Sequence, residues 1–84
     1  MTLRSLILKG LDEQAMSRQQ LADAIGLKTA VSVSKWIRLD RTEPVPWRHW
    51  TRLSKALRIP WKTWYRVAKK ELPDSARLYD LYLG

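Results

Sequence analysis

The segment from residue 17 to residue 37 constrains the fold of this chain more than any other, because it carries both the start and the end of a helix. Ser17 precedes Gln20 by three residues, a spacing that allows a capping box in which each side chain bonds the backbone N–H of the other residue. Helical spacing then continues through Leu21, Ala22 and Ile25. Gly26 follows, where a chain leaving a helix needs positive φ without a Cβ penalty. These features predict a helix that ends near Ile25 and a tight turn after it.

A second helix is predicted from Thr29 to Arg38. One side of it is apolar, with Ala30, Val33 and either Trp36 or Ile37. The other side is short, polar and basic, with Thr29, Ser32, Lys35 and Val31. Two helices joined by so short a turn approach closely only if the residue at their crossing is small, and Ala22 meets that need. A helical hairpin without a ligand carries the same signals, so they leave DNA binding and a plain hairpin both open.

Three motifs in this order resemble the helix-turn-helix family that includes lambda repressor and Cro. They are Leu21-Ala22-x-x-x-Gly26-Leu27, then Val33-Ser34-Lys35-Trp36, then Leu53-Ser54-Lys55-Ala56-Leu57-Arg58-Ile59. The resemblance covers roughly residues 3 to 60. It implies a compact all-α bundle that places its second motif helix in the major groove of double-stranded DNA.

The chain departs from the family pattern in two places. Between Gly26 and Val33 it has one residue more than the family usually has, and either the turn or the start of the second helix must absorb it. Which of residues 29–31 faces the bases therefore stays open. In the third motif, Ser54 stands where the family usually has alanine and Arg58 where it usually has glycine.

Helical spacing also appears before and after these motifs, so we expect about five short helices. Thr2 can cap the first, whose inward face carries Leu3, Leu6, Ile7 and Leu11. Gly10 lies inside that helix at a cost of about 1 kcal/mol relative to alanine. Residues 39–46 contain two prolines and no periodicity, which predicts a loop.

The last part of the chain predicts two helices and a short terminal element. Pro46 suits the first turn of one helix, with an inward stripe of Trp50, Leu53 and Leu57. Pro60 ends that helix and opens the next, which Pro73 ends. Asp74 can cap a terminal element over residues 75–83, either helix or strand. Of five tryptophans, Trp36, Trp50, Trp61 and Trp64 lie on helical stripes and are expected in the core, whereas Trp47 is expected to be partly exposed.

Composition excludes several classes of protein. An 84-residue chain forms one domain on length grounds. The absence of cysteine excludes disulfides and thiolate metal sites and fits a reducing cytoplasm. A single histidine, His49, and eight scattered acids offer no nucleophile, base or metal-ligand set, so we expect neither an enzyme nor a bound cofactor. No apolar run approaches the roughly 20 residues that cross a bilayer, and the first nine residues do not form a signal peptide.

The charge distribution favours a polyanionic partner. The formal net charge is +8, and between Arg18 and Lys70 thirteen Lys or Arg residues oppose three acids. Such an excess raises the local concentration of polyanions, whereas a surface that only keeps a protein soluble normally mixes both signs. Nucleic acid is the obvious partner.

Within that interpretation, the residues that would read base edges are Lys28, Thr29, Val31, Ser32 and Lys35. The residues that would contact phosphates are Arg18, Gln19, Arg38, Arg41 and Arg48. The first turns of the second helix hold no Asn, Gln or Arg, so bidentate readout is sparse and water or DNA shape is expected to carry part of the specificity.

The chain end is strongly apolar, and such a tail usually either packs back on its own core or meets a second subunit. Of the two we favour a dimerisation tail over residues 74–84, with Leu78, Leu81 and Tyr82 on one helical face. The favoured function is a homodimeric transcriptional regulator of the phage-repressor or Cro kind that recognises specific DNA sequences. The alternative is a protein-interaction module or antitoxin-like partner that uses its tryptophans and its apolar tail.

Overall fold

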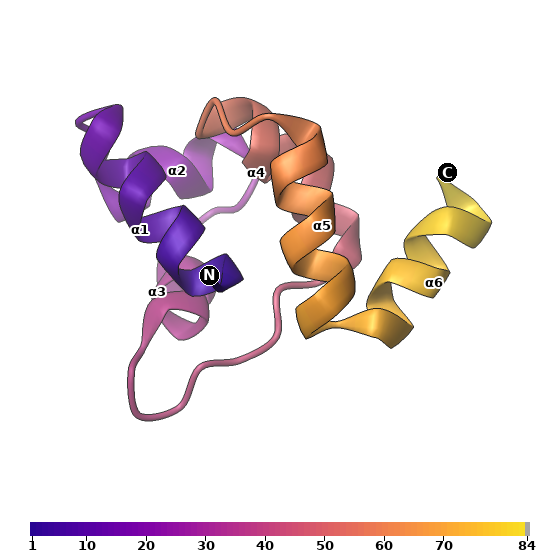
Figure 1. Cartoon of the computed structure of the whole chain (residues 1–84). Coiled ribbons are helices and arrows are strands. Elements are labelled where there is room, and N and C mark those ends of the chain that lie inside the picture. Colours follow the sequence, from indigo (N-terminus) through magenta and orange to yellow (C-terminus); the bar gives the residue numbers. More distant parts are fainter. Residues whose placement is uncertain (84) are drawn as a thin grey trace.

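The computed structural model describes residues 1–83, which fold into short helices joined by turns and one longer loop (Figure 1). Its elements in chain order are α1 (Leu3–Glu13), α2 (Arg18–Ala24), α3 (Val31–Ile37), the 3-10 helix η1 (Trp47–His49), α4 (Trp50–Ala56), α5 (Trp61–Glu71) and α6 (Pro73–Tyr82). No strand occurs in the described part of the chain, which confirms the predicted all-α class. None of the helices within residues 1–83 is both long and apolar enough to cross a membrane.

The helix starts follow the sequence signals with two corrections. Thr2 caps α1 through a capping box with Ser5, as its hydroxyl oxygen accepts from the backbone N–H of Ser5 at 3.1 Å. The helix expected at Pro46 begins as the single 3-10 turn η1 and becomes α-helical only at Trp50. The terminal element is a helix, so the strand alternative was wrong. It starts at Pro73 because proline needs no hydrogen-bond acceptor at the first helical position.

Three helices end in one and the same hydrogen-bonding pattern, the Schellman motif, in which the residue after the cap adopts a left-handed conformation. At the end of α2 this residue is Gly26, as predicted, with φ of 84°. The N–H of Leu27 there bonds the carbonyl of Ala22 at 2.8 Å. Helices α1 and α4 use Ala15 and Arg58 in the same role, with φ of 48° and 53°. Neither residue favours positive φ, so residue type does not indicate these sites, and only the family resemblance, with glycine usual at position 58, points to one of them.

The two residues at which the third motif departs from the family pattern, Ser54 and Arg58, both lie at the end of α4. Arg58 adopts the left-handed conformation that glycine would take without strain. The hydroxyl of Ser54 donates a hydrogen bond to the carbonyl of Ile59, the residue after Arg58, at 2.7 Å. Ser54 is buried and Ile59 is half-buried, so this bond is partly shielded from water. The serine therefore supports a helix end that lacks the usual glycine.

We expect Arg58→Gly to raise the free energy of unfolding by about 0.5–1 kcal/mol, because relief of left-handed strain exceeds the entropy that glycine adds to the unfolded chain. Urea unfolding of the purified variant measures it. Lys62→Gly, inside helix α5, is the matched control and should be destabilised by about 1 kcal/mol. Equal losses in both variants would contradict the interpretation.

The core lies between α1, α4 and α5, with α2 and α3 packed on one side. Trp50 and Trp64 are its largest fully buried side chains. Trp36 is also buried, as predicted, but Trp61 is only partly buried and packs against Tyr65 and Tyr79. Trp61 therefore packs against the core, as expected, but is not fully enclosed by it.

Helix α6 lies at the edge of the bundle, on the opposite side of the molecule from α3 in Figure 1. It packs back on its own chain through two aromatic rings. Tyr79 stacks on Trp50 with ring centroids 5.8 Å apart, and Tyr82 stacks on Trp47 at 5.6 Å. Large apolar side chains remain exposed on α6 and just after it, namely Leu78, Leu81 and Leu83. Gly84, the last residue of the predicted tail, lies outside the described residues.

Candidate nucleic-acid interface

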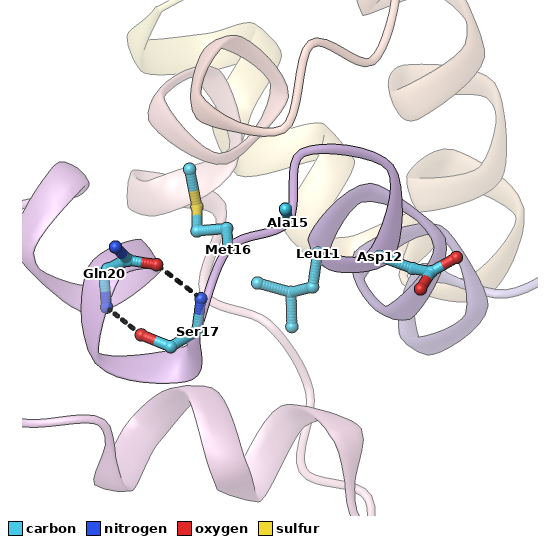
Figure 2. A pocket seen from close by; sticks show the side chains of 6 residues that line it. All are labelled: Leu11, Asp12, Ala15, Met16, Ser17 and Gln20. Carbon is cyan, nitrogen blue, oxygen red and sulfur yellow. Dashed lines mark hydrogen bonds between the residues drawn. The ribbon is translucent and has the colours of Figure 1, made fainter.

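The capping box at the start of α2 is present as predicted and fixes how this helix enters the candidate interface (Figure 2). The Ser17 hydroxyl accepts from the N–H of Gln20 at 3.0 Å, and the Gln20 side-chain oxygen accepts from the N–H of Ser17 at 2.7 Å. Met16, just before the cap, packs against the core. The first turn of α2 is therefore held in place by both its polar and its apolar neighbours.

Helix α3 is attached to the bundle by one side. Val33, Trp36 and Ile37 are all buried, so both of the alternatives at the end of the predicted stripe point inward. The helix is shorter than the predicted range Thr29–Arg38, since it begins at Val31 and ends at Ile37. At its C-terminal end, the Arg4 side chain donates to the carbonyl of Ile37 at 2.8 Å.

The residues before α3 form a bent connection over residues 28–30. Thr29 precedes the helix, where its hydroxyl oxygen accepts from the N–H of Val31 at 3.5 Å. Ala30 occupies the N-cap position, but its methyl side chain cannot accept a hydrogen bond and so does not cap the helix. Val31 is therefore the first helical residue, and residues 28–30 belong to the turn before α3.

None of the five predicted base-reading residues is buried. Lys28, Thr29 and Lys35 are exposed, and 57% of the surface of Val31 is accessible. Ser32 is half-buried, so its assignment to the open outer face needs correction. The cause is its position, 100° around the helix from Val31 and next to the buried side. The structure thus leaves one side of α3 and the connection before it open to solvent.

Three of the predicted phosphate-contacting side chains, Arg18, Gln19 and Arg38, already have polar partners. Arg18 lies across α3, with its guanidinium 3.4 Å from the Ser34 hydroxyl. The Gln19 amide donates to the Asp23 carboxylate at 2.9 Å and lies 3.4 Å from the Lys28 carbonyl. A phosphate would have to compete with these bonds for Gln19, whereas the Arg18 guanidinium keeps further N–H groups available. Sequence spacing did not indicate the Arg18–Ser34 contact, because it joins two different helices.

The loop after α3 carries the next two arginines and is anchored at both ends. The N–H of Glu43 bonds the Lys35 carbonyl at 3.0 Å, and the Trp50 indole N–H donates to the carbonyl of buried Val45 at 3.0 Å. Arg38 forms an exposed ion pair with Asp40 at 3.4 Å, and its hydrogen bond lowers the pKa of that carboxyl. Arg41 is exposed on the loop itself.

Arg48 belongs to η1, next to the loop rather than on it. Its guanidinium carbon lies 5.5 Å from the ring centroid of Trp47. Trp47 is half-buried, in agreement with the expectation that it is partly exposed. The neighbouring His49 ring lies 5.7 Å from the ring of Trp36, so η1 packs directly behind α3.

Acidification is expected to destabilise the fold through His49. Burial, and to a smaller extent the charge of Arg52, lower the pKa of His49 below 6.5, and its Nδ1 has no hydrogen-bond partner within residues 1–83. The unfolded chain therefore binds this proton more readily, so stability falls as the pH drops below 6.5. Urea unfolding at about pH 7.5 and about pH 5.5 should show a larger loss for the wild type than for His49→Gln. Equal losses would contradict this assignment.

Comparisons with protein-family models, with curated proteins and with solved structures find no match to this chain. Within the described residues no group of three or more His, Cys, Asp and Glu side chains could hold a metal ion.

Proposed function

We propose that the protein is a transcriptional regulator that binds specific sequences of double-stranded DNA with α3 in the major groove. The observation that carries the proposal is the one-sided attachment of α3, since Val33, Trp36 and Ile37 are buried while Val31 and Lys35 stay exposed. A major groove about 12 Å wide admits one helix presented in this way. Double-stranded DNA in the cytoplasm is the partner we expect.

Each open side chain has a distinct part in this proposal. Lys28 and Lys35 donate to guanine O6 and N7, and Val31 contacts a thymine methyl group. The Thr29 hydroxyl pairs with several bases, and Ser32 contributes only at the edge of the contact because it is half-buried. Phosphate contacts come from the exposed arginines around α3, namely Arg18, Arg38, Arg41 and Arg48, with Gln19 as a weaker partner.

We also propose that two copies bind together through α6. The support is the exposed apolar side of this helix, which includes Leu78 and Leu81 with 42% and 72% of their surfaces accessible. Tyr82 contributes only in part, because its ring already stacks on Trp47. Two half-sites about one helical turn apart would follow from a twofold arrangement. The same apolar side supports the alternative function, an interaction module for another protein.

Selection of bound duplexes from a random pool, followed by gel shifts over a salt series, tests the proposal. A regulator gives one enriched sequence and a slope of log affinity against log salt near −4 to −5 per subunit if about five phosphates are neutralised. A symmetric enriched site would indicate two subunits. Equal and weak binding to all duplexes would reject regulation and favour the interaction module.

Two variants separate base reading from phosphate contact. Lys35→Ala should relax specificity at one base pair by about 1–3 kcal/mol, because its ammonium lies on the open side of α3. Arg48→Ala should weaken binding to all sequences alike and reduce the salt slope by about 1. Competition gel shifts with single-base variants of the selected site measure both effects. The reverse pattern would show that α3 is not the reading helix.

A further inference from the structure

Most of the positive charge lies outside the α2–α3 unit. Residues 17–43 hold five Lys or Arg and three acids, whereas residues 44–70 hold eight Lys or Arg and no acid. The second range includes η1, α4 and most of α5, which the proposed base contacts do not use. Apart from the phosphate contact of Arg48, the proposed function therefore leaves the most basic part of the chain without a role.

Three of these eight cations line one pocket. It encloses about 600 Å³ and is bordered by Trp47, Arg48, Thr51, Arg52, Lys55 and Leu83. The three basic residues recur at positions i, i+4 and i+7, which places them along one side of η1 and α4. Within residues 1–83 none of the three forms an ion pair with a carboxylate. The lining thus offers several cationic donors and a hydroxyl, and no acidic side chain.

The groups around this pocket are held in position. The Arg52 guanidinium donates through Nη1 to the carbonyl of Ile25 at 3.2 Å, which ties it to the end of α2. Trp47 is fixed by its stacking on Tyr82, and Arg48 lies over the Trp47 ring. An arginine whose position is already restricted loses less conformational entropy when it binds a ligand. This feature distinguishes the pocket from a surface of freely moving lysines.

We infer that this pocket is a second phosphate-binding site, suited to a diphosphate or to two successive phosphates of a nucleic-acid backbone. Guanidinium groups match the geometry of phosphate oxygens, and a hydroxyl and an ammonium complete the set of donors. A neutral or cationic ligand would find few acceptors among the lining side chains. Binding of two successive backbone phosphates rests on the proposed DNA binding, whereas binding of a free diphosphate does not.

The test compares two variants that remove equal charge. In Arg52→Gln/Lys55→Gln both changes lie in the pocket, whereas in the control Lys62→Gln/Arg66→Gln both lie on the exposed side of α5. Titration calorimetry with sodium pyrophosphate probes a free ligand. Gel shifts with the selected duplex, at its minimal length and extended by about ten base pairs on each side, probe the backbone. The single variant Lys55→Gln changes only an exposed side chain, so it still tests the pocket if the double variant fails to fold.

Either of two results supports the site. Pyrophosphate binds the wild type and the control but binds the pocket variant at least about tenfold more weakly, which indicates a free phosphate ligand. Alternatively, pyrophosphate does not bind, but only the pocket variant loses the affinity gained from longer DNA, with a salt slope smaller by about 2. Equal behaviour of the two double variants in both assays overturns the inference while sequence-specific binding still stands. Failure to bind any duplex rejects the proposed function and leaves the pyrophosphate result interpretable.

Discussion

Trp50→Ala is expected to lower the free energy of unfolding by about 3–5 kcal/mol, a large part of what a domain of this size has available. Trp50 is fully buried, stacks on Tyr79 and bonds the Val45 carbonyl. Its removal would therefore leave a cavity and free both the loop after α3 and the helix α6. Thermal and urea unfolding followed by circular dichroism measure the loss.

A matched pair of smaller changes separates side-chain volume from hydrogen bonding. Trp64 is buried to the same extent as Trp50, but its indole N–H has no acceptor within the described residues. Trp50→Phe leaves the Val45 carbonyl without its hydrogen-bond donor, whereas Trp64→Phe removes an indole N–H that has no acceptor within the described residues. We expect the first variant to be less stable than the second by about 1–3 kcal/mol. If the two lose equal stability, the bond to Val45 contributes nothing beyond packing.

The features that could be predicted from the sequence are those that depend on neighbours within one or two helical turns. The capping boxes at Thr2 and Ser17 need only residues three positions apart, and both are present. The inward stripes of the helices follow from the 3.6-residue period in the same way, and Gly26 marks the end of α2 because its φ is a local property. Such signals are enough to predict the helices and the open side of α3.

The features that were missed join distant parts of the chain. Arg18 meets Ser34, and Arg52 meets Ile25, across different helices, and neither contact has a signature in spacing. The left-handed conformation of Arg58 differs from these contacts because its bonds are local, and those bonds, including the one that Ser54 donates, override the residue's own preference. For the candidate site, exposure of side chains could therefore be predicted, but not their partners.

Gly10→Val is the second change with a large expected effect, and it should lower the free energy of unfolding by about 3 kcal/mol. The reason is that α1 contacts the end of α4 at Gly10, where a side chain has no room. A Cβ atom at Gly10 would lie 2.8 Å from Cβ of buried Leu57, an atom that cannot move without its backbone. Gly10→Ala tests the same contact with a smaller side chain. Helix propensity alone would stabilise this variant by about 1 kcal/mol, whereas the clash of the new Cβ atom with Leu57 acts in the opposite direction. Lys9→Val is the control, because Lys9 is exposed on the same helix and should change stability by less than about 1 kcal/mol. Equal losses for valine at positions 9 and 10 in urea unfolding would mean that helix propensity, and not the contact with Leu57, explains why glycine stands there.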